Sequence, residues 1–206
     1  MSATNSRVRR IALGALMWLV AAHAALATPI TYSFDTFADG TSLTGQYAGL
    51  GFANGTVLRA GIGLNELSFP PRSGDGVLFD DGGPIVITFA TGASAVSGYF
   101  TYVDGLTLSA YDSSDNLIAI ATAAFLANVA DGSGDPGSAP NELLSVMATG
   151  DLIARIVISS SPGGASLALD DLTVDTAAVA VPSPGTLPLV MTGLLALAWR
   201  ARRRRH

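Results

Sequence analysis

Between positions 28 and 181 the chain alternates short apolar runs with clusters of turn-forming residues. Runs rich in β-branched and aromatic residues, such as 84–92 (PIVITFATG), are separated by segments rich in Gly, Asp, Ser and Pro. Turn clusters at this spacing are typical of antiparallel strands in a sandwich or barrel. The pattern therefore predicts an all-β fold, an antiparallel β-sandwich that forms one domain.

Strict period-two alternation marks two segments, 105–122 (GLTLSAYDSSDNLIAIAT) and 151–160 (DLIARIVISS). In the first segment Leu106, Leu108 and Ala110 share one face, and the turn formers DSSDN follow them, so this segment is predicted to be a hairpin. In the second segment every other position is apolar, and the predicted core face consists of Leu152, Ala154, Ile156 and Ile158.

The last predicted strand, 165–176 (ASLALDDLTVDT), changes its alternation halfway along. Its apolar residues occupy one side before Asp170 and the other side after Asp171. An extra residue in one strand produces such a switch, because side chains alternate between faces with a period of two. We therefore predict a β-bulge at Asp170 and Asp171 that turns one of the two carboxylates towards a neighbouring strand.

Charge is distributed unevenly along the chain. Of the 11 arginines only Arg59, Arg72 and Arg155 lie between the two ends, whereas all 16 acidic residues do, and Lys is absent. Three positive against 16 negative side chains give the stretch 28–181 a formal charge of −13, compared with −5 for the whole chain. A domain with this charge repels phosphate and has no basic patch, which excludes nucleic acid as a partner.

The first 27 residues have the layout of a secretory signal peptide. The basic segment RVRR precedes the apolar run IALGALMWLVAAHAALA, in which Ala25 and Ala27 occupy the positions that a signal peptidase reads. The run is shorter than the ~20 residues that a membrane span needs. Residues 1–27 are therefore predicted to form a signal helix that is removed after Ala27. Because Cys is absent from this exported chain, its stability must come from a core, a bound metal or both.

The chain ends in a Pro-x-Pro motif, a short apolar run and an arginine cluster. The motif is Pro182, Ser183 and Pro184, and the cluster includes Arg202, Arg203, Arg204 and Arg205. This order over residues 182–206 resembles the PEP-CTERM (Pro-Glu-Pro C-terminal) sorting signal of Gram-negative bacteria, although Ser183 stands where that family most often has Glu. The resemblance implies processing by a membrane-embedded exosortase and a location at the cell surface or outside the cell.

The apolar run of this tail, 187–199, suits a transient membrane span. As a helix it would be about 20 Å long at ~1.5 Å per residue, whereas the hydrocarbon core of a bilayer is ~30 Å thick. The positive-inside rule keeps the arginines in the cytoplasm and places the Pro-x-Pro motif at the outer face of the inner membrane. A retained tail anchor is the alternative, because hydropathy does not distinguish a retained helix from one that is cut.

The mature stretch also resembles the β-sandwich domains found in front of such signals, which are lectin-type, carbohydrate-binding jelly rolls. The residues that carry the resemblance are Phe34, Asp35, Gly40, Tyr47, Gly49, Gly51, Phe52, Asn141, Glu142, Leu169, Asp170 and Asp171. The resemblance implies a jelly-roll order of strands, like that of a carbohydrate-binding module.

Residue types limit the chemistry of the mature stretch. Both histidines, His23 and His206, lie in the terminal segments and Cys is absent, which excludes Ser-His-Asp and Cys-His catalysis and a His/Cys zinc site. A pair of carboxylates among Glu66, Asp75 and Glu142 is left for glycoside hydrolysis. Both Trp residues lie in the terminal segments as well, so the domain lacks the indole platforms common in sugar clefts. The sequence therefore favours a protein that is not an enzyme.

Oxygen-rich turns make calcium the candidate metal. In the loop 131–142 (DGSGDPGSAPNE), four residues occupy positions 1, 3, 5 and 12 of an EF-hand-like pattern, namely Asp131, Ser133, Asp135 and Glu142. Pro136 replaces the Gly that this pattern needs at its sharp turn, so a true EF-hand is excluded. A second candidate site joins Asp35 to Asp170 and Asp171, because the first and last strands of a jelly roll often lie side by side.

Three tyrosines, Tyr99, Tyr102 and Tyr111, are candidate platforms for stacking on a sugar ring, with packing within the sheet as the alternative. The favoured function is that of an exported, exosortase-processed protein with a structural or adhesive role in extracellular polysaccharide. Its processing partners would be signal peptidase, exosortase and, transiently, the inner membrane. The alternatives are a carbohydrate-binding module that recognises a specific glycan and a glycosidase-like enzyme.

Overall fold

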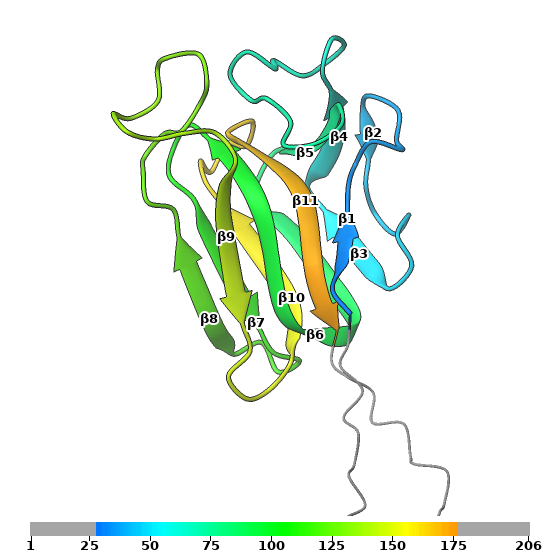
Figure 1. Ribbon diagram of the computed structural model, residues 1–206. Coiled ribbons are helices and arrows are strands. Elements are labelled where there is room, and N and C mark those ends of the chain that lie inside the picture. The colour runs from blue at the N-terminus through cyan, green and yellow to red at the C-terminus, as the bar shows by residue number, and fades with distance from the viewer. Residues whose placement is uncertain (1–27, 177–206) are drawn as a thin grey trace, which may run out of the picture. The chain divides into compact units, whose positions relative to one another are not determined.

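The computed structural model describes residues 28–176, which contain β-strands and no helix (Figure 1). The strands are β1 (Ile30–Tyr32), β2 (Thr41–Ser42), β3 (Leu50–Ala53), β4 (Gly55–Arg59), β5 (Gly76–Asp80), β6 (Ile85–Tyr102), β7 (Thr107–Tyr111), β8 (Leu117–Thr122), β9 (Glu142–Met147), β10 (Ile153–Ser159) and β11 (Leu167–Thr176). Nothing in this range could therefore cross a membrane as a helix. The predicted signal peptide and sorting signal, with their helices, lie outside the described residues.

The long strand β6 belongs to two layers. Its first part pairs with β3 and β10, and the part from Ala93 onwards pairs with β11 and β9. The change occurs at Gly92, which has a φ of 73° and sits against Leu152, where a Cβ would meet the Leu152 Cβ at 2.9 Å. Gly is required at position 92 because residues with a side chain rarely adopt this φ and because Leu152 leaves no space for a Cβ.

One layer, called layer 1, has the strand order β3-β6-β10-β7-β8. The other, layer 2, has β9, β6 and β11 side by side, as Figure 1 shows, and continues from β11 to β5, β4 and β2 in one half and to β1 in the other. Every ladder between these strands is antiparallel, which confirms the predicted all-β antiparallel fold.

The core lies between the two layers and contains the alternate residues of their strands. Leu106, Leu108 and Ala110 belong to it, as the period-two pattern predicts, and β7 and β8 form the predicted hairpin around the turn 112–116. Residues Ala27–Ala178 form one compact unit, so the domain has a core of its own and is expected to fold without the terminal segments.

The predicted core face of β10 is correct for Ile156 and Ile158 but wrong at the start of the strand. Ile153 is fully buried there, whereas Leu152 is 38% exposed and precedes the strand. The pairing with β6 shifts register between Ile153 and Arg155, which reverses the side to which the first residues point. The sequence pattern gives no sign of this shift, because Leu152 and Ile153 are both apolar and either one could begin the core face.

The predicted β-bulge in β11 is confirmed, but the prediction that it turns a carboxylate towards a neighbouring strand is wrong, because Asp170 binds the loop before β5. Pairing with β6 breaks between Asp170 and Thr173, and Asp171 has a φ of 48°. The extra residue lets Leu169 and Leu172 both face the core, with 0% and 1% exposure, although three positions separate them. The first and last strands also lie side by side, because Ile30 pairs with Val174.

A second, smaller buried cluster lies on the outer side of layer 2. It consists of Leu64, Phe69, Val77, Val129 and Ala168. The cluster joins Ala168 of β11 and Val77 of β5 to residues from the long connections before β5 and before β9. Loops therefore cover one end of this outer surface, whereas alternate residues along the rest of β6, β9 and β11 stay partly or fully exposed.

Candidate functional site

Asp35, Asp170 and Asp171, the three carboxylates of the second predicted calcium site, gather at one loop, 72–76. Asp170 turns its buried carboxylate out of the bulge, where Oδ2 accepts the N–H groups of Arg72 and Ser73 at 2.7 and 2.9 Å. Its Oδ1 accepts the N–H of Asp171 at 2.7 Å. Burial raises the pKa of Asp170 to about 6, although these N–H bonds act to lower it.

Asp35 binds the far end of the same loop. Its Oδ1 accepts the N–H groups of Asp75 and Gly76 at 2.8 and 2.9 Å. Burial acts to raise the pKa of Asp35, but the hydrogen bonds from Gly76 and Asp75 outweigh it and lower the pKa. Asp171 accepts the hydroxyl of Ser73 at 2.9 Å. The three carboxylates therefore hold the loop against both terminal strands.

No group of three or more His, Cys, Asp and Glu side chains within 28–176 is placed to hold a metal ion. Asp35, Asp170 and Asp171 meet at one loop and are bonded to groups of that loop, and calcium binding by them stays a prediction.

The other calcium candidates do not share a common point. Asp131 accepts the hydroxyls of Ser68 and Ser133 at 2.6 and 2.5 Å, and these bonds, with the Ser133 side chain foremost, lower the pKa of Asp131 to about 2. The carboxylates of Asp135 and Glu142 instead accept the backbone N–H groups of Leu126, at 2.7 Å, and Ala124, at 3.0 Å. Each carboxylate fastens a different part of the long connection between β8 and β9.

The predicted tyrosine platforms separate into one buried and two partly exposed residues. Tyr102 is 0% exposed, and its hydroxyl donates a hydrogen bond to Glu142 Oε2, while burial raises its pKa. Its prediction as an exposed sugar platform is therefore wrong. Tyr99 and Tyr111 point outwards from layer 2 and layer 1 respectively, so the sandwich core lies between them.

Tyr111 is part of a stacked group on the outer face of layer 1. The guanidinium carbon of Arg155 lies 3.9 Å from the centroid of the Tyr111 ring. Arg155 Nε donates a hydrogen bond to Asp115 Oδ1 at 3.0 Å, and the Asp115 side chain is 78% exposed. The ion pair and the ring hold the guanidinium flat, which leaves its other N–H groups available for a ligand.

The turn between β7 and β8 positions this group. Asp112 Oδ1 accepts the N–H groups of Ser114 and Asn116 at 2.8 and 2.9 Å, and its Oδ2 accepts the Asn116 side-chain amide at 2.9 Å. The Asn116 side chain, foremost among these donors, lowers the pKa of Asp112. The bonded turn places Asp115 at a φ of 64°, from which its carboxylate reaches Arg155. The sequence DSSDN thus builds a support for Arg155 as well as a turn.

The outer side chains of layer 1 around this group are small, apolar or hydroxylated. Pairing registers place them in rows across the five strands. We call this surface the Tyr111 face, and it consists of Leu117, Tyr111, Arg155, Thr88, Ile120, Ser109, Val157, Val86, Ala53, Thr122, Thr107 and Ser159. Arg155 is the one charged residue that the strands contribute to this face. The domain as a whole has a formal charge of −13, from three arginines and 16 acidic residues.

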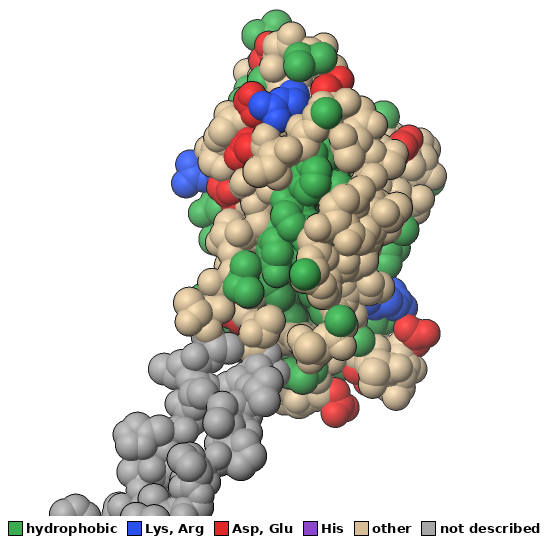
Figure 2. Space-filling model, turned by 90° about the vertical axis from the view of Figure 1, so that its right-hand side faces the viewer, with side chains coloured by type: hydrophobic (Ala, Val, Ile, Leu, Met, Phe, Trp, Pro, Cys, Tyr) green, Lys and Arg blue, Asp and Glu red, His purple; other side chains and the backbone are tan. Residues whose placement is uncertain are grey.

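An apolar groove follows the edge of the sandwich that carries β1 to β4. Figure 2, which views the molecule from this side, shows hydrophobic side chains in a stripe between more polar surfaces. Four rings surround Tyr47 with centroid distances of 5.0 to 6.4 Å, namely Tyr32, Phe34, Phe37 and Phe52.

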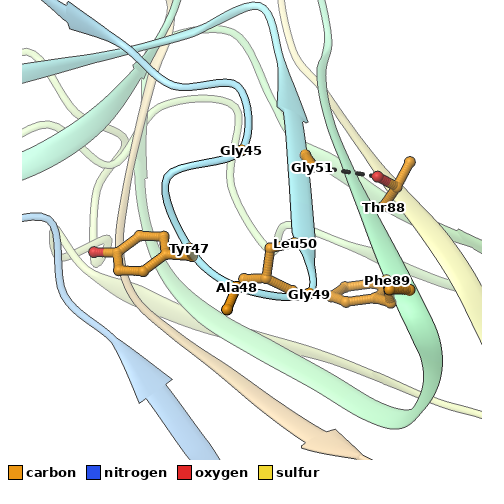
Figure 3. A pocket seen from close by; sticks show the side chains of 9 residues that line it. Gly45, Tyr47, Ala48, Gly49, Leu50, Gly51, Thr88 and Phe89 are labelled. Carbon is orange, nitrogen blue, oxygen red and sulfur yellow. Dashed lines mark hydrogen bonds between the residues drawn. The ribbon is translucent and has the colours of Figure 1, made fainter.

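Beside Tyr47 the groove widens into a hollow of about 390 Å³ that is lined by Leu50, Phe89 and small residues (Figure 3). The Tyr47 hydroxyl is already bonded to the Ser33 carbonyl, and three of the four rings meet Tyr47 edge to face. These rings therefore close the open edge of the core and present few free polar groups to a ligand.

Arg72, Arg155 and Asp115 are the functional candidates that the sequence reasoning missed. Two of the three arginines in the described domain stack on tyrosine rings, Arg72 on Tyr99 at 4.7 Å and Arg155 on Tyr111. Only the position of Arg155 on the outer side of a predicted strand pointed to such a role. The stacking itself depends on pairing between strands that are distant in the chain.

No protein-family model matches this chain, and no curated protein matches it. Solved structures do resemble it. The K2 cleaved adhesin domain of Lys-gingipain is 12% identical with a TM-score of 0.46, over 71% of this chain and 99% of that one. A DUF4465 family protein from Bacteroides caccae is 13% identical with a TM-score of 0.46, over 72% of this chain and 99% of that one. A family 29 carbohydrate-binding module is 13% identical with a TM-score of 0.41, over 73% and 89%. Likenesses this distant carry no argument about function, which rests on the residues of this chain.

Proposed function

We propose that this chain is an exported, non-catalytic module that binds polysaccharide through the Tyr111 face and has an adhesive or structural role in the extracellular matrix. The observation that carries the proposal is the stacked group of Tyr111, Arg155 and Asp115 on an open sheet face. A defined glycan specificity, as in a carbohydrate-binding module, is the finer form of this proposal.

The chemistry of the face suits a sugar chain. A pyranose offers a C–H surface that packs on an aromatic ring, together with hydroxyls that donate and accept hydrogen bonds. The guanidinium of Arg155 covers one face of the Tyr111 ring, so the two groups together supply a flat stacked surface. Arg155 also supplies donors, and the exposed Asp115 carboxylate supplies acceptors. Because these groups hold one another in place, little side-chain entropy is lost on binding.

An uncharged polysaccharide fits better than an acidic one. The charge of Arg155 is offset by Asp115 at 3.0 Å, and the rest of the domain is strongly acidic. A uronic acid chain would therefore meet repulsion that weakens only with salt.

The arrangement of carboxylates supports a role without catalysis. Asp75 accepts a charged hydrogen bond from Arg59 at 2.5 Å, and Glu142 is bonded to Tyr102 and Ala124. Glu66 is exposed in the connection before β5. Asp75 and Glu142 therefore bind separate structural partners, and among the described residues no contact joins either of them to Glu66 as an acid and base pair. The glycosidase-like alternative therefore has no observation in its favour.

Export and sorting form the second part of the proposal and rest on the terminal sequences. Removal of residues 1–27 by signal peptidase and cleavage near Pro182-Ser183-Pro184 by exosortase would deliver the domain to the cell surface or the matrix. The test is the intact mass of the protein purified from its native host. We expect a mass that begins at residue 28 and lacks 187–206. A mass that retains that tail would overturn the sorting proposal.

Affinity electrophoresis of the mature domain, residues 28–181, tests glycan binding. Gels would contain mixed-linkage β-glucan, xylan or galactomannan as uncharged polysaccharides and alginate as an acidic one. We expect retardation by at least one uncharged polysaccharide and none by alginate. Tyr111→Ala should weaken the interaction about tenfold, which corresponds to ~1.4 kcal/mol, whereas Tyr111→Phe should retain it. Ile62→Ala, an exposed loop residue away from the face, is the matched control. Equal retardation of Tyr111→Ala and Ile62→Ala would contradict the assignment of the face.

A further inference from the structure

A second tyrosine and arginine pair lies on the opposite outer face of the sandwich. Tyr99 points outwards from β6 in layer 2, and the guanidinium carbon of Arg72 lies 4.7 Å from the centroid of its ring. The backbone N–H groups of Arg72 and Ser73 are bonded to the buried carboxylate of Asp170. Arg72 therefore extends over Tyr99 from a loop that the bulge in β11 holds in place.

A row of hydroxyl side chains crosses this face next to the pair. Ser145, Ser97, Thr173 and Thr31 occupy directly paired positions on β9, β6, β11 and β1. All four are partly or fully exposed, and the Thr31 and Thr173 hydroxyls lie 2.9 Å apart. Four adjacent strands at ~4.8 Å spacing make a row about 14 Å long, which offers donors and acceptors in a line across the sheet.

Apolar groups border the hydroxyl row on both sides. Leu143 pairs with Tyr99 on one side, and Met147 pairs with Ala95 on the other. Leu143 and Met147 are 56% and 68% exposed. A line of hydroxyls between apolar borders, next to the stacked pair of Tyr99 and Arg72, matches the alternating C–H and O–H surface of a sugar chain. We call these residues, with Arg72, the Tyr99 face.

The Tyr99 face and the Tyr111 face cannot serve one ligand strand. They lie on the outer sides of layer 2 and layer 1, and the core separates the two layers. Stacked sheets are ~10 Å apart before the outer side chains are added, so a strand on one face does not reach the other. Two occupied faces therefore require two strands.

We infer that the Tyr99 face is a second glycan site and that a single domain cross-links two strands of uncharged polysaccharide. The inference rests on the proposed function and deepens it, because bridging gives the domain a means of organising a matrix. An uncharged polysaccharide is the occupant that the charges favour. The acidic domain opposes anionic partners, and the cation of this face already stacks on Tyr99.

Calorimetric titration of residues 28–181 counts the sites. The probe is a short oligosaccharide prepared from the polysaccharide that retards the domain most strongly. We expect two sites of full affinity per wild-type domain, one in Tyr99→Ala, one in Tyr111→Ala, and none in the double variant, because each substitution weakens its own site about tenfold. Arg72→Gln keeps the backbone bonds to Asp170 and the sheet intact, so it serves where Tyr99→Ala fails to fold, and it should weaken one of the two sites. Ile62→Ala should keep both sites.

Light scattering of the parent polysaccharide measures bridging directly. The wild-type domain and Ile62→Ala should increase the scattering, and either single tyrosine variant should abolish the increase while still binding the oligosaccharide. One site in the wild-type domain that is unaffected by Tyr99→Ala would overturn the second site and leave the proposed function standing. Absence of any binding by the wild-type domain would overturn the proposed function itself. Loss of all binding in Tyr99→Ala alone would place the single site on layer 2 and refute bridging.

Discussion

Replacement of Gly74 by Ala tests how the carboxylates hold the 72–76 loop. Gly74 has a φ of 54°, in the left-handed region, and it packs directly on Asp35. A Cβ at Gly74 would overlap the Asp35 carboxylate, which accepts the N–H groups of Asp75 and Gly76. The added methyl group must therefore displace either the loop or the carboxylate.

Two contributions make up the expected loss of stability. A left-handed backbone costs an L-residue about 1 kcal/mol more than Gly. Displacement of the carboxylate removes two hydrogen bonds to a charged acceptor, each worth ~1.5 kcal/mol at a partly exposed site. Gly74→Ala should therefore lower the free energy of unfolding by about 4 kcal/mol, a large share of the stability of a domain.

Urea unfolding followed by far-ultraviolet circular dichroism measures this loss, because both Trp residues lie outside the mature domain. Gly40→Ala is the matched control, since Gly40 has a φ of 74° but no atom lies within 4 Å of its added Cβ. It should cost only the backbone contribution of about 1 kcal/mol. In an Asp35→Ala background Gly74→Ala should also cost about 1 kcal/mol. A cost that stays near 4 kcal/mol in that background would refute the role of Asp35.

Three further predictions concern buried polar groups and calcium. The folded state holds the Asp170 proton more tightly than the unfolded chain, because burial raises its pKa to about 6. Its stabilising contribution is complete below about pH 4 and is lost as the pH rises through about 6, a decrease of ~3 kcal/mol that Asp170→Asn should remove from urea-unfolding profiles. Parallel profiles for the two proteins would contradict this. The buried side chain of Asn128 accepts the N–H of Tyr102 at 2.7 Å and donates to the Phe100 carbonyl at 2.9 Å. Asn128→Ala should therefore lower the free energy of unfolding by about 3 kcal/mol in the same assay. A cost near zero would mean that both backbone groups find other partners. If calcium binds at Asp35, Asp170 and Asp171, titration calorimetry should show heat that Asp170→Asn abolishes; no heat, or heat that the variant retains, would dismiss this site.

The sequence alone determined those features that depend on neighbouring residues. The hairpin of β7 and β8 follows from a period-two pattern and a turn of Asp, Ser and Asn within a single stretch. The bulge at Asp170 follows from a change of alternation within one strand. The gathering of Asp35, Asp170 and Asp171 at one loop agrees with the expected pairing of the first and last strands.

Only the tertiary structure decided which side chains are available to a ligand. Tyr99, Tyr102 and Tyr111 all lie on strands, yet only Tyr102 packs in the core, where Glu142, 40 positions away, accepts the hydrogen bond of its hydroxyl. The stacking of Arg72 on Tyr99 likewise depends on a loop that Asp170 holds from 98 positions away. Local alternation determines which residues share a side of one strand. The exposure of that side and its neighbours depend on how distant strands pair and on which loops cross them.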